Sequence, residues 1–292
     1  MTQESPDSPP ALSGNPLSSP LSSMGTLIAI AVGNTRTRVG SFADRECLNP
    51  QSFDSSDPGA IAQRVNEIAE SCREDSGDDP TIVMAGVRPT SSDEIERTIR
   101  KATGQTIYRF GRDFQIPIQH TLTDAGEMTV GQDRLLCALG AFDVLNQACV
   151  VIDAGTAVTV DFVDGTGVFH GGAIIPGVSM MLSSLHDTAA NLPKLTYRKL
   201  DPSSNEPAKQ TDEAILLGVT FAVRGAVRLL TERYAEHYQG YPQTIVTGGD
   251  LGILEDDELI DSFVPDLQLQ GIRVACSKLL NDSDDLDAND QE

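Results

Sequence analysis

Glycine turns that carry a carboxylate or a hydroxyl are the most chemically informative features of this sequence. After the apolar run 150–152, Asp153 and Thr156 enclose Ala154 and Gly155, so a carboxylate lies at the end of a strand of the type buried on both faces. Glycine lets backbone amides approach an anion closely, and a threonine hydroxyl adds a further donor. This combination is typical of a phosphate-binding turn.

A weaker copy of this pattern lies about 120 residues earlier. The apolar run 27–32 leads into Gly33, Asn34 and Thr35, and an alternating strand follows at 37–41. Two hairpins of this kind indicate two related lobes with a nucleotide clamped between them. The alternative is an ordinary glycine turn in each half of an α/β protein, because short glycine motifs are weakly specific.

The stretches between the turns predict the elements that position them. Apolar runs and apolar alternation predict strands, and apolar residues three and four apart predict helices. The first lobe is predicted as ββαβαβ, with its last strand at 106–110, and an irregular polar linker follows at 112–130. That linker delivers the GQDR sequence at 131–134 to the start of a helix whose leucines face the core.

The second lobe is predicted to continue from the central hairpin with three helices and one more strand. The helices are expected at 178–185, 211–230 and 271–280, and the strand at 244–247. The apolar stripe of the 211–230 helix is wide, which favours a core face together with a subunit interface.

Composition excludes several classes of partner. A formal charge of −22 argues against nucleic-acid and anionic membrane surfaces, because both are polyanions. Five cysteines without a C-x-x-C pair indicate reduced thiols rather than a disulfide framework or a zinc site. No apolar run approaches the ~18 residues of a membrane span, and no signal-peptide pattern is present. The sequence therefore predicts a cytoplasmic protein.

Four regions are predicted from these patterns. A Ser/Pro-rich arm at 1–23 is expected to be disordered, and Met24 is an alternative start. The N-terminal lobe is expected at 24–130 and the C-terminal lobe at 131–280. The last segment, 281–292, holds six acidic residues and no basic one, and is expected to be a disordered tail.

Seven short motifs occur in a fixed order along the chain. They are GNT at 33–35, GQDR at 131–134, DAGTAVT at 153–159, GGAIIPG at 171–177, TAANLP at 188–193, QTDEAILLG at 210–218 and TGGD at 247–250. Any one of them is weakly specific, but seven in this order make chance similarity improbable. On these motifs, residues 25–280 resemble the type III pantothenate kinases of the actin, sugar-kinase and heat-shock ATPase superfamily.

The resemblance implies a fold and an activity. The fold would be two ribonuclease-H-like lobes, the duplication seen in actin-like ATPases, with the nucleotide cleft between them. The activity would be transfer of the γ-phosphate of ATP to pantothenate, the first step toward coenzyme A. The resemblance further implies a homodimer, Mg²⁺ with ATP, and a monovalent cation, K⁺ or NH₄⁺.

The resemblance also implies roles for individual residues. The first phosphate loop would contain Gly33, Asn34, Thr35 and Arg38, the second would contain Thr156, and Asp153 would be the monovalent-cation ligand. The pantothenate loop would consist of Gly131, Gln132, Asp133 and Arg134, with Asp133 as the proton acceptor. Thr211 would be a further pantothenate contact. Phosphoryl transfer suits such a set, because it needs positioning and charge neutralisation more than covalent chemistry.

Each role has a simpler structural alternative. Asp133 could accept the hydroxyl proton, or it could be a first-turn aspartate that favours the helix dipole. Arg134 could fork onto a carboxylate or phosphate, or form a surface ion pair worth at most ~1 kcal/mol. Asp153 could be held by turn amides without a metal. Thr211 could be only a helix N-cap.

The sequence departs from the family pattern at the first loop. The family reads D-x-G-N-T there, with the aspartate helping to hold Mg²⁺, and Ala31 occupies that position here. The tyrosine and proline expected shortly before GxDR are also absent. The alternative function is therefore a catalytically impaired relative that binds nucleotide or pantothenate as a regulator. A third possibility is another phosphotransferase or a phosphatase on the same lobes.

Overall fold

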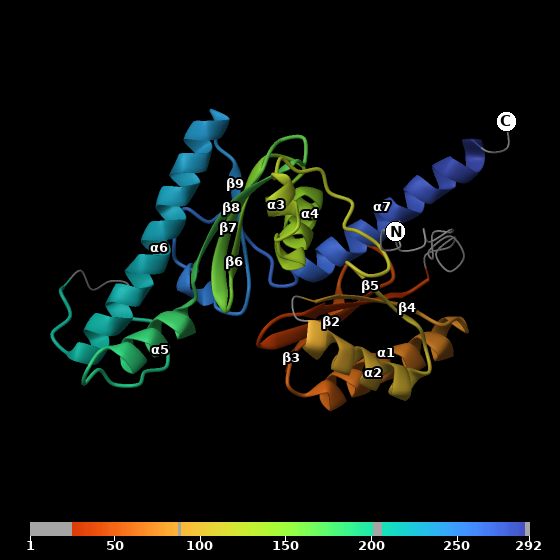
Figure 1. Ribbon diagram of the computed structural model, residues 1–292, viewed down its shortest axis with the longest axis horizontal. Coiled ribbons are helices and arrows are strands. Elements are labelled where there is room, and N and C mark those ends of the chain that lie inside the picture. Colours follow the sequence, from red (N-terminus) through yellow and green to blue (C-terminus); the bar gives the residue numbers. More distant parts are fainter. Residues whose placement is uncertain (1–24, 87–88, 201–205, 290–292) are drawn as a thin grey trace, which may run out of the picture.

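Two separate five-stranded sheets form the framework of the computed structural model, which describes residues 25–86, 89–200 and 206–289 (Figure 1). The predicted N-terminal arm at 1–23 lies outside the described residues. Helices pack on both faces of each sheet. The α/β class predicted from the sequence is confirmed.

Sheet 1 is built from the first third of the chain. Its strands are β1 (Leu27–Val32), β2 (Arg36–Phe42), β3 (Leu48–Asp54), β4 (Thr81–Gly86) and β5 (Ile107–Arg109), in the spatial order β3-β2-β1-β4-β5. The central strand β1 pairs antiparallel with β2 and parallel with β4. All six of its residues are buried, which explains the continuous apolar run in the sequence.

Sheet 2 repeats this topology. Its strands are β6 (Cys149–Ala154), β7 (Ala157–Val163), β8 (Phe169–Pro176), β9 (Gln243–Thr247) and β10 (Ser262–Phe263), in the spatial order β10-β9-β6-β7-β8. The central strand β6 pairs antiparallel with β7 and parallel with β9, as β1 does with β2 and β4. The two-lobe duplication predicted from the paired hairpins is therefore confirmed.

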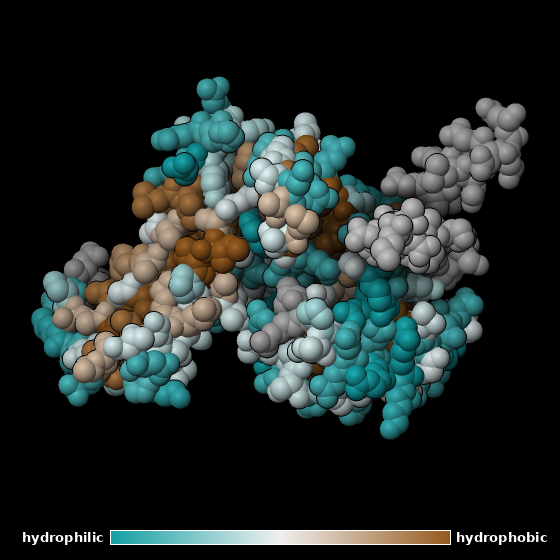
Figure 2. Space-filling model, viewed as in Figure 1, coloured by the Kyte–Doolittle hydropathy of each residue, from teal (hydrophilic) through white to brown (hydrophobic). Residues whose placement is uncertain are grey.

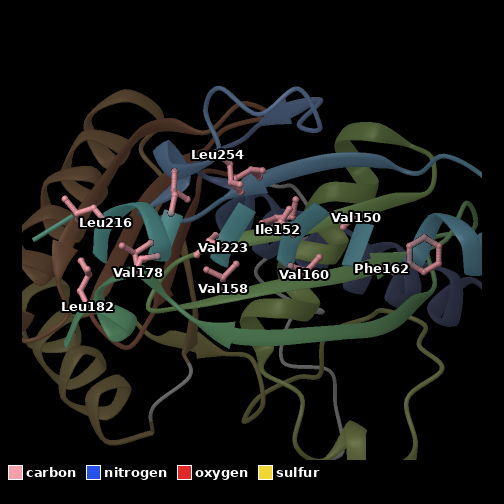
Figure 3. Close-up of a cluster of buried hydrophobic side chains, with 14 of the residues drawn as sticks. Val150, Ile152, Val158, Val160, Phe162, Val178, Leu182, Leu216, Val223 and Leu254 are labelled. Atoms are coloured by element: carbon pink, nitrogen blue, oxygen red, sulfur yellow. The ribbon is translucent and has the colours of Figure 1, made fainter. Parts of the chain in front are cut away.

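Two pairs of helices cover the outer faces of the sheets. α1 (Pro58–Ser76) and α2 (Pro89–Thr103) pack on sheet 1, and α5 (Val178–Thr188) and α6 (Thr211–Tyr238) pack on sheet 2 (Figure 1). In sheet 2 the side chains of Val150 and Ile152 of β6 lie in one buried cluster with Leu216 and Val223 of α6, and Val223 lies near the middle of that cluster (Figure 3). The inward stripe of α6 is therefore a core face.

The inner faces share a second pair of helices, α4 (Gln132–Leu145) and α7 (Leu267–Asn289). One inner cluster joins these helices to β1 and β4, and another joins them to β6 and β7. The helices cross closely, because a Cβ on Gly271 would lie 1.9 Å from the carbonyl oxygen of Leu136. A glycine is required at this crossing, because a side chain there would separate the two helices of the layer that the lobes share.

The structure differs from the sequence-based prediction at the edges of the lobes. β3 was not predicted, because six of its seven residues are exposed and no apolar alternation marks it. Lobe 1 is therefore βββαβαβ rather than ββαβαβ. The linker contains one helical turn, α3 (Asp124–Glu127), and the 3₁₀ turn Leu251–Ile253 follows β9.

The last predicted helix, at 271–280, is shorter than the observed helix α7. α7 begins four residues before the predicted helix and continues through Asn289, so it includes most of the acidic segment predicted as a tail. Of the described residues, only α6 is long and apolar enough to cross a membrane by length and composition. One stripe of α6 packs on sheet 2, whereas Phe221 and Leu229 on the same helix are exposed.

Candidate functional site

The two glycine turns identified in the sequence meet across the boundary between the lobes. The β1–β2 turn carries Thr35 and the β6–β7 turn carries Thr156, and their hydroxyl oxygens lie 3.1 Å apart. Both side chains are exposed. Two hydroxyls from opposite lobes therefore converge on one accessible point, as expected for a phosphate held between the turns.

Each turn is held in shape by its own lobe. In lobe 1 the Gly33 amide donates to the Arg36 carbonyl, and the hydroxyl of the buried Ser55 donates to the Gly33 carbonyl. In lobe 2 the Gly177 amide donates to the Thr156 carbonyl at 3.1 Å. A Cβ on Gly177 would lie 2.3 Å from the carbonyl oxygens of both Gly155 and Thr156, so only glycine fits there.

Asp153 lies beside the second turn, at the end of β6. Burial raises its pKa to about 7; Asp133 and Asp161 raise it as well, while Arg38 lowers it. The backbone of Gly248 lies against it, because a Cβ on Gly248 would be 2.6 Å from its Oδ1. The carboxylate is therefore enclosed, and an additional cation would be electrostatically stabilised beside it.

The GQDR residues form the start of α4, at the junction of the lobes. The Asp133 carboxylate accepts from the Arg134 amide at 3.0 Å and folds over Gly131, where a Cβ would lie 2.2 Å from Oδ1. Gln132 donates to the Phe110 carbonyl at the end of lobe 1. The side-chain amide oxygen of Gln132 is buried and has no hydrogen-bond partner, so this turn holds an unsatisfied acceptor.

Arg134 forms an internal ion pair with Asp161 of β7. The Arg134 Nε lies 3.1 and 3.0 Å from the two Asp161 oxygens, and Nη2 also donates to Oδ1. The Asp161 side chain is only 2% exposed, and the guanidinium lies 5.7 Å from the Phe169 ring centroid. The carboxylate that Arg134 binds therefore belongs to the protein, and the pair anchors the start of α4 on sheet 2.

Thr211 lies apart from the other predicted residues. It is the first residue of α6, which covers the face of sheet 2 opposite to α4. There it lines an apolar groove of about 790 Å³ between α5 and α6, with Met180, Leu185 and Ala222. The surface around this groove is markedly hydrophobic (Figure 2). Exposed large apolar side chains of the elements that border the groove include Ile174 on β8, Met180 on α5, and Phe221 and Leu229 on α6.

The two lobes offer different surroundings to a metal ion. Within the described residues, no group of three or more His, Cys, Asp or Glu side chains lies close enough together to hold one. Asp153, with turn carbonyls nearby, provides the oxygen ligands that a hard cation prefers. At the equivalent place in lobe 1, Ala31 is 2% exposed and provides no ligand. Lobe 2 therefore fits a cation, and the β1 end of lobe 1 does not.

Three residues of the site were given no role from the sequence, although Gly248 lies in the TGGD motif. Ser55 supports the first turn, Asp161 pairs with Arg134, and the Gly248 carbonyl accepts from Arg38 at 3.4 Å. A lone aspartate within the apolar strand 158–163 was the only local signal of Asp161. The other two contacts join residues that are distant in sequence, so no local pattern indicates them.

Comparisons with known proteins identify relatives of this chain. The family model described as type III pantothenate kinase matches residues 27–233. A protein of that name from Parafrankia sp. is 30% identical over 259 residues, covering 86% of this chain and 98% of its own. One from Syntrophotalea carbinolica is 28% identical and covers 85% and 97%. One from Rhodopirellula baltica is 44% identical over a shorter stretch, 44% of this chain and 46% of its own.

A solved structure from Campylobacter jejuni, described as a conserved candidate transcriptional activator of the Baf family, has the same fold. It matches with a TM-score of 0.56 at 14% identity, covering 87% of this chain and 99% of its own. At this identity the likeness concerns the fold alone.

Proposed function

Because this chain belongs to the type III pantothenate kinase family, whose members phosphorylate pantothenate with ATP on the way to coenzyme A, we propose that the cleft between its lobes performs this reaction with Asp133 as the proton acceptor. The observation that carries the proposal is the convergence of Thr35 and Thr156 from opposite lobes, 3.1 Å apart. Two such turns can hold the phosphates of one nucleotide between them.

The reaction needs few protein groups. The pantothenate hydroxyl oxygen attacks the γ-phosphorus, the new O–P bond forms, and the bond from the γ-phosphorus to the bridging oxygen of ADP breaks. The hydroxyl proton passes to the Asp133 carboxylate. Asp133 is accessible at the start of α4 and has no cation paired to it among the described residues, so its oxygens can reach a substrate hydroxyl.

The other residues of the site have supporting roles in this proposal. Gly33, Asn34, Thr35 and Thr156 bind phosphates, and Gly131 allows the Asp133 carboxylate to fold back over the turn. The unsatisfied oxygen of Gln132 accepts from pantothenate. Arg134 is a positioning residue, because its guanidinium is bound to Asp161. Asp153 is the ligand of a monovalent cation, which would add positive charge beside the second phosphate turn.

Substitution of Asp133 tests the proposal directly. A coupled ADP-release assay with pantothenate, Mg²⁺·ATP and K⁺ should show turnover that Asp133→Asn lowers by at least about 100-fold, the scale of general base catalysis. Asp124→Asn, an exposed aspartate of α3, is the matched control and should leave turnover unchanged. Turnover that survives Asp133→Asn would remove Asp133 from the mechanism. Binding of ATP without turnover in the unmodified protein would favour the regulatory alternative. The relatives of this chain, which are named as kinases, do not favour that alternative.

We also propose a homodimer formed through the α5–α6 surface. Apolar side chains there are well exposed, Phe221 by 64% and Leu229 by 67%, which is unusual for a monomer. A second copy of the same apolar face would cover them in a two-fold arrangement. Thr211 lines the same groove, so its proposed contact with pantothenate would have to involve this interface.

The location and the lobe boundaries also remain proposals. A metabolic enzyme of this family would act in the cytoplasm. The division at 130/131 is supported by the sheets, because every strand of sheet 1 precedes residue 110 and every strand of sheet 2 follows residue 148. The shared layer of α4 and α7 means that neither lobe has an independent inner face.

A further inference from the structure

The duplicated topology makes one position of the two lobes directly comparable. Ala31 precedes the turn glycine Gly33 by two residues, and Asp153 precedes Gly155 by two residues. Both lie on the central strand of their sheet, and each pairs with a residue of the following antiparallel strand. The partner of Asp153 is Thr159, whereas the partner of Ala31 is Arg38. Lobe 2 therefore has a carboxylate at this place, and lobe 1 has a guanidinium opposite a methyl group.

Arg38 reaches across the cleft. Its Nη2 donates to the carbonyl of Gly248 at the end of β9, at 3.4 Å. This is a long hydrogen bond to a neutral acceptor, so a phosphate oxygen could replace it at little cost. Among the described residues no ion pair involves Arg38, in contrast to Arg134, which donates to Asp161 through Nε and Nη2. The side chain is half-buried, and its charge also acts on Asp153 beside the second phosphate turn, where it lowers the pKa of that carboxyl.

From this geometry we infer that Arg38 neutralises the nucleotide phosphates on the lobe 1 side, in place of a divalent cation held there by the protein. Its guanidinium is available for this because the alanine at position 31 has no group that could pair with it. The inference rests on the proposed function for the identity of the ligand, a nucleoside triphosphate. It goes beyond that function by assigning the charge neutralisation to a side chain of lobe 1. The divalent cation then arrives with ATP and needs no ligand from β1.

Alanine at position 31 is what leaves the guanidinium available. An aspartate there would face Arg38 directly across the β1–β2 pair and would bind it as Asp161 binds Arg134. A planar guanidinium suits this task, because its donors match two phosphate oxygens at once and it remains charged at every physiological pH. Such a charge-assisted contact is stronger where the guanidinium is partly shielded from water, as the half-buried Arg38 is.

The consequence is binding of ATP without a divalent ion. Isothermal titration calorimetry of the full chain with ATP in EDTA, and separately with excess Mg²⁺, should give dissociation constants within about tenfold of each other for the unmodified protein. Arg38→Gln should weaken metal-free binding by about 10- to 100-fold, the range for loss of a charged hydrogen bond, and should weaken Mg²⁺·ATP binding much less.

Arg36→Gln is the matched control. Arg36 lies on the same strand and carries the same charge, but it is exposed and donates to Ser52 on β3. It should leave metal-free binding within about twofold of the parent, which separates a specific contact from a change in net charge. Ala31→Asp should weaken metal-free binding in the same direction as Arg38→Gln, because the new carboxylate binds the guanidinium. Thermal unfolding of each variant shows whether the fold is retained.

The outcomes separate this inference from the proposed function. ATP that binds only with Mg²⁺, or an equal loss in Arg36→Gln and Arg38→Gln, would overturn the role of Arg38 even if pantothenate turnover is normal. Arg38-dependent binding in EDTA without any pantothenate turnover would uphold the role of Arg38 and refute the proposed acceptor. If Ala31→Asp does not fold, the comparison of Arg38→Gln with Arg36→Gln still decides the question.

Discussion

Removing Arg134 should destabilise the protein strongly, because its partner Asp161 is buried. The two side chains are 14% and 2% exposed, and Arg134 lowers the pKa of Asp161 through both its hydrogen bonds and its charge. Removing one partner of such a pair leaves an uncompensated charge and costs about 3–5 kcal/mol, whereas an exposed pair is worth at most ~1 kcal/mol. Arg134→Met, which keeps most of the apolar stem, should therefore lower the free energy of unfolding by about 3–5 kcal/mol.

The loss should depend on pH in a defined direction. Burial already raises the pKa of Asp161 above the ordinary value of 3.8, and removal of the guanidinium raises it further. A carboxyl whose pKa is higher in the folded state binds its proton more tightly there, so it opposes folding increasingly as pH rises from the unfolded value to the folded one. The destabilisation by Arg134→Met should therefore be largest above the folded pKa and shrink as pH falls toward 3.8.

Urea unfolding at two pH values measures this effect. The parent, Arg134→Met and Arg134→Met/Asp161→Asn should be compared at one protein concentration, because a dimer's stability depends on it. The double variant should recover much of the loss, since no buried charge remains. Arg198→Met is the control, because its pair with Asp212 spans 3.8 Å between side chains that are 56% and 41% exposed. A loss below about 1 kcal/mol for Arg134→Met, or one independent of pH, would refute the reasoning.

Two further variants test the second phosphate turn and the apolar surface. Gly177→Ala should lower the free energy of unfolding by about 1–3 kcal/mol and weaken ATP binding, because its methyl group would overlap the carbonyls of Gly155 and Thr156. Gly249→Ala, which has open space around its Cβ, is the matched control, and equal effects in calorimetry and urea unfolding would contradict the steric explanation. Phe221→Asp should convert the dimer to a monomer in multi-angle light scattering, because an aspartate cannot be buried unpaired in an apolar interface. A parent protein that is already monomeric would contradict the interface.

Much of the fold was predictable because its signals are local. The central strands β1 and β6 are buried on both faces, so each is a continuous apolar run, and each is followed by a glycine and a hydroxyl. These patterns located both turns and indicated two lobes. The edge strand β3 had no such signal, because its side chains face solvent and its residues are mostly polar.

The site was predictable only in its parts. Residues of each turn and of the GQDR segment could be assigned from motifs, since every motif is contiguous in sequence. The same motifs could not show that Arg134 is bound to Asp161, because the acceptor lies 27 residues further along the chain on another element. An arginine beside the proposed base therefore positions α4, although its sequence context is equally compatible with a substrate contact.

The sequence by itself determined the buried central strands, the glycine turns that follow them, and the family to which the motifs point, because each depends on residues close together in the chain. Tertiary structure decided which groups share the cleft. Thr35 meets Thr156 across 121 residues, and Arg38 meets Gly248 across 210. Those contacts arise only when two sheets of the same topology pack on the common layer of α4 and α7. The charge arrangement around Ala31 is therefore a property of the assembled lobes.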